Sequence, residues 1–141
     1  MEKTALTTFP VRYAETDQMG VVHHGNYVIW CEVGRTALLN ELGFSYRAME
    51  ESGVVSPVTK INLSYKTPAV YGDDVTVSTW IEAYNGVRIT YGYVIKNRSE
   101  NILAEGTSEH VCCDEETFRP IQLKKRFPEW HKAYMQNKIK S

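Results

Sequence analysis

The sequence lacks a long apolar run, a secretory signal and paired cysteines. None of its 141 residues lies in an apolar segment near the ~18 residues of a membrane-spanning helix, so we expect no membrane span. The opening "MEKTALTTFPVRY" has one early lysine but no apolar core and no small-residue cleavage site. Three cysteines, two of them adjacent (Cys112 and Cys113), give no disulfide framework. We therefore expect a reducing, cytoplasmic compartment.

Motifs for metal ions and nucleotides are also missing. His23, His24 and the stretch "HVCC" (110–113) fit neither the C-x₂-C nor the H-x₃-H spacing of zinc sites. The stretch "GVVHHGN" (20–26) has no lysine and no P-loop spacing, so nucleotide hydrolysis is unsupported. We expect no metal and no cofactor.

Charge is distributed unevenly along the chain. Residues 119–141 carry seven Lys and Arg against one Glu, or +6, whereas the other 118 residues sum to −7. A basic segment could meet a phosphorylated ligand, nucleic acid or lipid, and a solvated tail is the plainer interpretation. Length and an ordinary composition indicate one domain over residues 1–141, with a basic C-terminal segment from about residue 119.

Helical spacing is strongest just after residue 26. Asn26 is expected to be the N-cap and Gly43 the C-terminal stop. The other faces of this segment are apolar too, which predicts a helix buried on most sides. Gly34 costs about 1 kcal/mol in a helix interior, so we expect another element to pack closely there. Glu32 and Arg35 have the spacing of an ion pair on the helix surface. The periodic apolar positions are Tyr27, Trp30, Cys31, Gly34, Ala37 and Leu38.

Beyond about residue 54 the apolar period changes to two, which is typical of strands. An earlier extended segment is expected over 7–15, and Asn85-Gly86 is a strong hairpin signal. Pro128 could start a short helix. Successive strands without crossover helices are antiparallel, so an α+β fold with one sheet around one helix follows. The four strand segments are "INLSYK" (61–66), "VTVSTWIEA" (75–83), "VRITYGYVI" (87–95) and "ILAEGTSEHVCC" (102–113).

The loop "ETDQMGVVHHGNY" (15–27) joins an acid to the start of the buried helix. Asp17 alone is more often a turn residue, and His23 and His24 are more often surface residues. However, free N–H groups at a helix N-terminus can hold a carbonyl oxygen as negative charge develops on it. A nearby carboxylate can attack that carbonyl or activate water. The combination suits acyl transfer to water, whereas Cys31 on the buried face is interpreted as a core residue.

The segment "YAETDQMGVVHHGNYVIWCEVGRT" (13–36) resembles the signature of the 4-hydroxybenzoyl-CoA thioesterase family of hotdog-fold proteins. The nearest branch resembles the small bacterial acyl-CoA thioesterases. The shared pattern is Y-x-[DE]-T-D-x-x-G-x-V-x-[HY]-x-x-Y-x-x-[WFY]-x-E-x-x-R. The stretches "YKTPAVYGDDVTVSTWI" and "ILAEGTSEHVCCDEETFRPIQL" are similar to the family's sheet region. The "H-F-P" and "D-x-N-P-x-H" motifs of hotdog dehydratases and hydratases do not occur.

The resemblance implies a hotdog fold, in which an antiparallel sheet wraps one long central helix. It also implies a homodimer or homotetramer with sites at subunit interfaces. Asp17 falls on the family's catalytic acid, and His24 on a His or Tyr position near the helix turn that polarises the thioester carbonyl. His23 stands where many relatives carry tyrosine, which leaves its role open.

An acyl-CoA thioesterase is therefore the first expectation. Asp17 would act as nucleophile or general base, and His24 would orient the substrate or Asp17. The N–H groups around His24, with Gly25, Asn26 and Tyr27, would form the oxyanion hole. A non-catalytic acyl-CoA-binding or assembly module of the same fold is the alternative. A nucleic-acid binder acting through the basic tail has no supporting motif, so no nucleic-acid partner is expected.

Substrate contacts remain open at the level of sequence. The CoA phosphates need cations from the partner subunit or the C-terminal segment. The acyl group could be aromatic or aliphatic. The candidate cations are Lys60, Arg88, Arg119 and Lys124, and the candidate pocket residues are Tyr27, Trp30, Tyr65 and Trp80.

Overall fold

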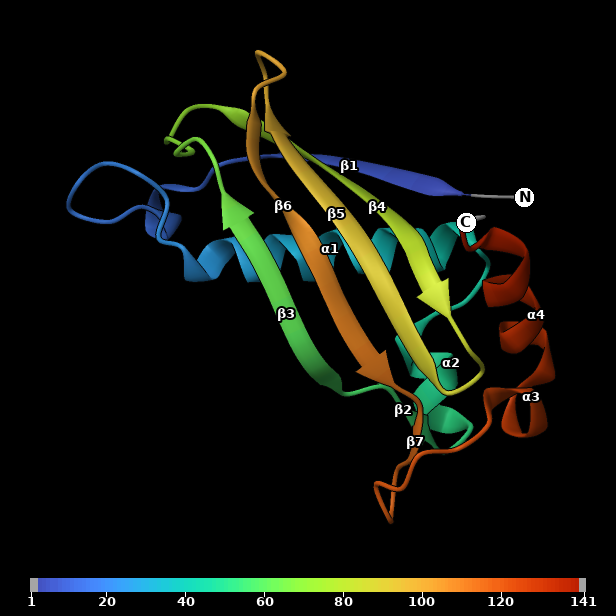
Figure 1. Cartoon of the computed structure of the whole chain (residues 1–141). Helices are drawn as coiled ribbons and strands as arrows, with labels where there is room; N and C mark the ends of the chain where they lie inside the picture. Colours follow the sequence, from blue (N-terminus) through green and yellow to red (C-terminus); the bar gives the residue numbers. More distant parts are fainter. Residues whose placement is uncertain (1–2, 140–141) are drawn as a thin grey trace.

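A computed structural model describes residues 3–139, apart from the side chain of Tyr46 (Figure 1). A five-stranded antiparallel sheet in the order β1-β4-β5-β6-β3 packs one face against the long helix α1. Its strands are β1 (Thr4–Pro10), β3 (Val58–Tyr65), β4 (Asp74–Tyr84), β5 (Arg88–Asn97) and β6 (Ile102–Val111). The other elements are η1 (Tyr13–Glu15), α1 (Gly25–Glu41), α2 (Tyr46–Glu51), β2 (Val54–Val55), β7 (Cys113–Asp114), α3 (Leu123–Arg126) and α4 (Pro128–Asn137). The predicted α+β arrangement of a sheet on one helix is confirmed.

Alternation of apolar side chains builds the inner face of the sheet. In β4, Val75, Val77, Thr79 and Ile81 are completely buried, while the residues that alternate with them are partly exposed. Strands β4 and β5 pair in register, and their hairpin turns through Gly86 at φ +98°. All four predicted strand segments are present.

Helix α1 lies close to the sheet at its middle. A Cβ atom on Gly34 would collide with Thr79 Oγ1 and would lie 2.6 Å from Val77 Cγ1. The expected close packing at Gly34 is therefore confirmed. Arg35, expected to pair with Glu32 on the surface, is instead buried, and its Nη1 donates to the Tyr93 hydroxyl at 3.1 Å.

The expectation that α1 is buried on most sides is wrong for the single chain. Ile29 and Val33, on the face turned away from the sheet, are 47% and 40% exposed. On the edge strand β3, the inward-facing Ile61 and Tyr65 are 42% and 49% exposed. The sheet covers one side of the helix and leaves its own β3 edge open (Figure 1). Coverage of the remaining face would need atoms from outside the chain.

The segment before the helix differs from the predicted extended run over 7–15. Strand β1 ends at Pro10, and η1 follows because the Glu15 carboxylate accepts the Arg12 backbone N–H at 2.8 Å and turns the chain. Asn26 is not the N-cap. Helix α1 begins two residues earlier than predicted, at Gly25 with His24 as N-cap, and Asn26 Nδ2 donates to the Glu15 carbonyl at 3.0 Å.

The basic C-terminal segment is folded, so a wholly solvated tail is wrong for the described residues. Pro128 starts α4, as expected, and Trp130 and Tyr134 are buried. Phe44, just beyond α1, stacks on Trp130 with ring centroids 4.8 Å apart. This places α4 at the C-terminal end of α1 (Figure 1). Among residues 3–139, no helix has both the length and the apolar character needed to cross a membrane.

Candidate active site

Glu15 organises the loop between β1 and α1. Its carboxylate is 4% exposed and accepts from Arg12 N at 2.8 Å, from Trp30 Nε1 at 2.8 Å and from Arg12 Nη2 at 3.4 Å. Its carbonyl accepts from His23 N at 2.9 Å and from Asn26 Nδ2 at 3.0 Å. The start of the loop, its end and the helix interior therefore meet at one residue.

Ionisation of Glu15 follows from these contacts. Burial acts to raise the pKa of this carboxyl group, but the hydrogen bonds from the Arg12 amide, the Trp30 indole and the Arg12 side chain outweigh it. The pKa of Glu15 is consequently lowered, because all three donors stabilise the charged form. A negative charge is thus fixed beneath the loop at neutral pH.

Asp17 sits at the tip of the same loop. Its Oδ1 accepts from Met19 N at 2.8 Å, and its own N–H donates to Val21 O at 2.8 Å. Gly20, at φ +82°, closes this turn. Asp17 is therefore a turn residue, as the plainer interpretation held, yet only one carboxylate oxygen is used. Within residues 3–139, Oδ2 receives no hydrogen bond, and the side chain borders a cavity of about 490 Å³.

The first amides of α1 are mostly occupied. Gly25 N donates to His23 Nδ1 at 3.1 Å, Asn26 N to His23 O at 3.0 Å, and Tyr27 N to His24 O at 3.3 Å. The amide of His24 is the exception, because it donates no hydrogen bond to the described part of the chain. Of the N–H groups predicted to form the oxyanion hole, the His24 amide is therefore the one that is not already hydrogen-bonded within residues 3–139.

The two histidine side chains are exposed and in contact, with ring centroids 4.3 Å apart and ring planes tilted by 30°. His23, whose role the sequence left open, accepts the Gly25 amide through Nδ1. His24 borders a second cavity, of about 260 Å³. No hydrogen bond joins the His24 imidazole to Asp17 among residues 3–139, so the structure does not bring the two predicted catalytic side chains into contact.

Aromatic rings form much of the wall of the second cavity. Tyr27 and Tyr65 meet edge to face at 5.1 Å, and Tyr65 donates its hydroxyl to His24 O at 3.2 Å. Burial raises the pKa of Tyr27, whose hydroxyl oxygen accepts the Ala69 amide. Trp30 lies behind Tyr27 in the core. Trp80 does not border this cavity; it lies on the outer face of the sheet over Gly92, where it borders a separate cavity.

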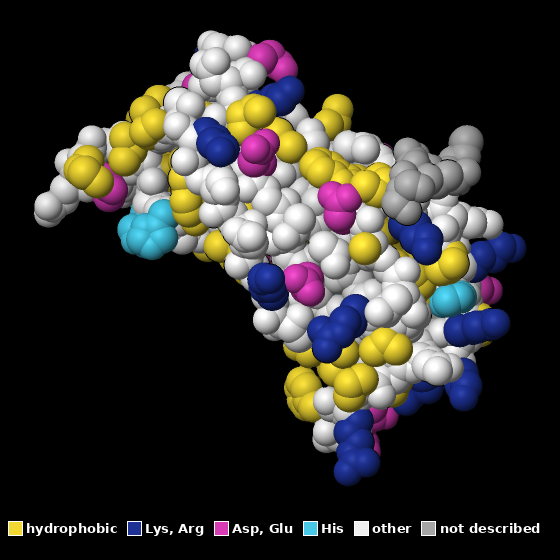
Figure 2. Space-filling view, viewed as in Figure 1, with side chains coloured by type: hydrophobic (Ala, Val, Ile, Leu, Met, Phe, Trp, Pro, Cys, Tyr) yellow, Lys and Arg dark blue, Asp and Glu magenta, His cyan; other side chains and the backbone are white. Residues whose placement is uncertain are grey.

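The predicted phosphate-binding cations lie away from this site within one chain. Lys60 Nζ is 3.9 Å from Glu109 Oε2, and Arg88 begins β5 next to the Gly86 turn. Arg119 and Lys124 belong to the C-terminal region, at the other end of α1 from the Asp17 loop (Figure 1). Lys and Arg side chains gather over α3 and α4 in Figure 2.

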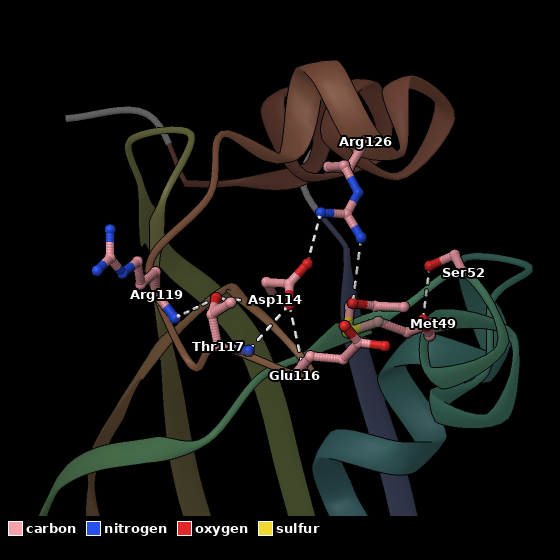
Figure 3. A network of polar contacts seen from close by, with 8 residues as sticks. Met49, Ser52, Asp114, Glu116, Thr117, Arg119 and Arg126 are labelled. Atoms are coloured by element: carbon pink, nitrogen blue, oxygen red, sulfur yellow. Dashed lines mark hydrogen bonds and ion pairs between the residues drawn. The ribbon is translucent and has the colours of Figure 1, made fainter.

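A polar network holds part of that basic region in place (Figure 3). Arg126 donates through Nη1 to Asp114 Oδ2 at 3.0 Å and through Nη2 to Gly53 O at 3.3 Å. Arg126 is therefore engaged in structure. The Arg119 backbone joins the same turn by donating to Thr117 Oγ1 at 3.2 Å, and its guanidinium extends away from the network in Figure 3.

Sequence reasoning missed two residues of the site. Glu15 falls on the family pattern without an assigned role, and the restriction of that position to Asp or Glu, two residues before Asp17, was the available signal. Lys66 directly follows the pocket residue Tyr65 and borders the cavity beside His24. Lys66 is a cation of the same chain at the cavity that His24 borders.

Cysteine chemistry is disfavoured at this site. Cys31 lies on the buried face of α1, and burial raises the pKa of its thiol to about 12. Among residues 3–139, Asp17 Oδ2 is instead a carboxylate oxygen that accepts no hydrogen bond, and the His24 amide is an N–H group that donates none. Asp17 and His24 border two different cavities, but they belong to one loop, and a carboxylate with an N–H donor suits attack on a carbonyl carbon whose oxygen gains negative charge.

Comparison with known proteins identifies relatives over most of the chain. Residues 11–136 match the thioesterase-like superfamily. YneP of Bacillus subtilis is 57% identical over 124 residues, covering 88% of this chain and 90% of YneP. The acyl-CoA thioester hydrolase YbgC of Escherichia coli is 33% identical, with 86% and 92% covered. The DHNA-CoA thioesterase structure from Staphylococcus aureus superposes with a TM-score of 0.91 at 45% identity, covering 94% of this chain and 89% of that one.

Proposed function

The chain belongs to the thioesterase-like superfamily, and on that premise we propose that it hydrolyses acyl-CoA thioesters to a free acid and CoA. The predicted hotdog fold and enzyme class are confirmed by these relatives. The observation that carries the catalytic assignment is the unused His24 amide at the start of α1, on the loop that ends the Asp17 turn.

In the proposed reaction, the thioester carbonyl oxygen accepts the His24 N–H. Asp17 Oδ2 either attacks the carbonyl carbon or removes a proton from an attacking water. Attack expels CoA as thiolate and leaves a mixed anhydride, which water then hydrolyses to regenerate the carboxylate. With water as nucleophile, the proton taken by Asp17 passes to the departing thiolate. Both routes consume one water and release the same two products.

The remaining predicted residues take supporting roles in this proposal. The amides of Gly25, Asn26 and Tyr27 point along the helix start and contribute its partial positive charge. The His24 imidazole contacts the substrate in the adjoining cavity instead of orienting Asp17. Lys66 meets the anionic part of the substrate, because it borders the same cavity.

An aromatic acyl group is the proposed substrate class. The cavity beside His24 is walled by the rings of Tyr27 and Tyr65, which favour edge or face contact with another ring. The Staphylococcus aureus relative acts on DHNA-CoA, which supports the same choice. Membership of the 4-hydroxybenzoyl-CoA thioesterase branch, which the sequence resembles, is part of this proposal.

A homodimer or homotetramer in the cytoplasm is the proposed assembly. The open β3 edge and the exposed Ile29 and Val33 would both gain cover from a second copy. Antiparallel pairing of two β3 edges would bring the partner's far end toward this chain's Asp17 loop. Lys60, Arg88, Arg119 and Lys124 are therefore proposed to serve the partner's substrate. Light scattering that finds a folded, active monomer would contradict the assembly.

Turnover of a panel of acyl-CoAs tests the proposed activity. We expect hydrolysis by the wild-type protein, with aromatic acyl-CoAs preferred over straight-chain ones. Asp17→Asn keeps the shape but removes the charge, so kcat should fall ~10²–10⁴-fold with an unchanged melting temperature. Binding without turnover in both proteins would support the acyl-CoA-binding module instead. Near-wild-type hydrolysis by Asp17→Asn would remove Asp17 from the mechanism.

A further inference from the structure

Glu15 joins the two halves of the proposed catalytic machinery. We propose that it is a positioning residue, which sets the distance between the Asp17 carboxylate and the His24 amide through its bond to Trp30. This role rests on the proposed function. No part of it requires Glu15 to touch the substrate.

The carboxylate anchors the loop to the helix interior. Trp30 is 2% exposed and belongs to the second turn of α1, so its indole N–H is a fixed point in the core. Glu15 Oε2 accepts that N–H at 2.8 Å, while Oε1 accepts the Arg12 amide at 2.8 Å. The carboxylate thereby sets where the chain turns just before Asp17.

The path from Glu15 to Asp17 is short and constrained. Thr16 is the intervening residue, and both its N–H and its Oγ1 donate to Tyr13 O, at 3.0 and 2.7 Å. Thr16 also forms a bridge with Val22 on the returning side of the loop. Few backbone rotations remain between the two acids, so a shift of Glu15 is passed on to Asp17.

The backbone carbonyl of Glu15 positions the other proposed catalytic group, the His24 amide. It accepts the N–H of His23 at 2.9 Å, and the carbonyl of His23 accepts the Asn26 amide at 3.0 Å. The peptide group between His23 and His24 carries the unused N–H, and it is thus held from both sides. Glu15 therefore constrains the direction of the proposed oxyanion donor as well as the position of Asp17.

Catalytic rates are sensitive to such placement. A displacement of about 1 Å caused by a residue that does not touch the substrate can cost ~10²-fold in rate. In Glu15→Gln, Oε1 can still meet one donor, but the new NH₂ group would face either Arg12 N–H or the Trp30 indole. In Glu15→Asp, the charge remains but the side chain is too short to reach Trp30 without moving the loop.

The chain offers a matched control for these variants. On the outer face of the sheet, Trp80 Nε1 donates to Glu82 Oε1 at 3.2 Å. Glu82→Gln alters a second tryptophan–carboxylate bond that lies away from the Asp17 loop. We expect Glu15→Gln and Glu15→Asp to lower kcat by ~10–100-fold with KM within about threefold of wild type. Glu82→Gln should change neither constant.

A double-mutant cycle isolates the bond itself. Trp30→Phe should lower kcat, and adding Glu15→Gln to it should cost much less than Glu15→Gln costs alone. Loss of the same factor in both backgrounds would overturn the Trp30 link. Should Glu15→Gln fail to fold, Asn26→Ala removes the Nδ2 contact with the Glu15 carbonyl and should lower kcat in the same manner.

Nuclear magnetic resonance supplies a readout that does not depend on turnover. The indole N–H signal of Trp30, identified by its loss in Trp30→Phe, should shift and exchange faster with solvent in Glu15→Gln. A changed signal with kcat within twofold of wild type would overturn the positioning role and leave the proposed function intact. Failure of the wild-type protein to hydrolyse any acyl-CoA would overturn both.

Discussion

The two ends of α1 each bury a tryptophan, and their indole groups meet opposite surroundings. At the N-terminal end, Trp30 Nε1 donates to the ionised Glu15 carboxylate at 2.8 Å. At the C-terminal end, Trp130 lies between Phe44, Phe127 and Tyr134, and its Nε1 has no hydrogen-bond partner among residues 3–139. One end is organised by polar contacts and the other by apolar packing.

This difference separates chemistry from stability along a single helix. Polar contacts fix direction, so the N-terminal end can hold a carboxylate and an amide in set positions near an open cavity. Aromatic packing buries a large area without directional demands, and it tolerates an unpaired indole N–H that costs roughly 1–3 kcal/mol. Substitutions at the first end should lower the catalytic rate as well as the stability, whereas those at the second end should lower stability alone.

Ionisation provides the largest expected effect and extends the comparison. Glu15 is held charged, whereas His110, buried near the end of β6, is held neutral. Burial and, to a lesser extent, the nearby Arg35 lower the pKa of His110 to about 4, although a hydrogen bond to Ser56 O acts in the opposite direction. Between about pH 4 and 6.5, His110 is therefore protonated in the unfolded chain and neutral in the folded chain.

The contribution of neutral His110 to the free energy of unfolding should be fully present above pH 6.5 and should decline as the pH falls toward 4. The full loss is about 3 kcal/mol, and it should be absent from His110→Gln. Urea unfolding across this range measures it. Glu15→Gln serves as the control, because the lowered pKa of Glu15 can affect stability only below 4.5. Equal pH dependence in wild type and His110→Gln would contradict the neutral histidine.

The two tryptophans allow a direct test of the comparison. Trp30→Phe and Trp130→Phe remove the same volume, but the first also leaves a buried carboxylate short of a donor. We expect Trp30→Phe to be the more destabilising by about 1–3 kcal/mol and to lower kcat, with kcat unchanged in Trp130→Phe. Chemical denaturation and turnover rates check this. Equal losses in both measurements would mean that the ends do not differ.

Gly34 lies between the ends and sets the distance from helix to sheet. Gly34→Ala would force a Cβ against Val77 and Thr79, which costs ~1–3 kcal/mol and outweighs the ~1 kcal/mol gained in helix propensity. We expect a net destabilisation of about 1–2 kcal/mol in thermal unfolding. Asn40→Ala on the exposed face is the control and should be neutral or slightly stabilising. A Gly34→Ala protein as stable as wild type would show that the sheet yields.

The smallest expected effect concerns the basic residues near the C-terminal end of α1. It would make the difference between the two ends less sharp, because that end would also take part in substrate binding. Neutralising Arg119, Lys124 and Lys125 together should raise KM for acyl-CoA about fivefold without changing kcat, since a phosphate contact is equal in ground and transition states. A thioester of a short pantetheine-like thiol should be unaffected. Arg126→Gln is the contrasting variant, because its bond to Asp114 predicts lost stability. Unchanged KM would assign these cations to solubility.

Much of the fold could be predicted because its causes are local. Val75, Val77 and Ile81 alternate because one face of β4 is covered, and the spacing of Trp30, Gly34 and Leu38 follows from one face of a helix. Asp17 and His24 were found by resemblance to a family. Short elements such as α2 and α3 escaped prediction, because a few residues carry too little periodicity to be distinguished from loops.

Other features depend on contacts that a sequence pattern does not contain. The bond between Glu15 and Trp30 spans fifteen positions and two elements. Equally, the exposure of Ile29 and Val33 depends on how far the sheet reaches round the helix. An apolar residue has the same sequence signature whether its cover comes from its own chain or from another.

The contact between Tyr65 and His24 has a consequence for handling the enzyme. Tyr65 belongs to the open β3 edge, and its hydroxyl donates to the carbonyl of the residue that begins α1. Whatever occupies the edge therefore acts on the proposed oxyanion donor through one side chain. If dilution dissociates the proposed second copy from the β3 edge, each molecule should turn over more slowly, in addition to the ordinary fall in rate with enzyme concentration. Specific activity would then vary with protein concentration, and Tyr65→Phe should weaken that dependence.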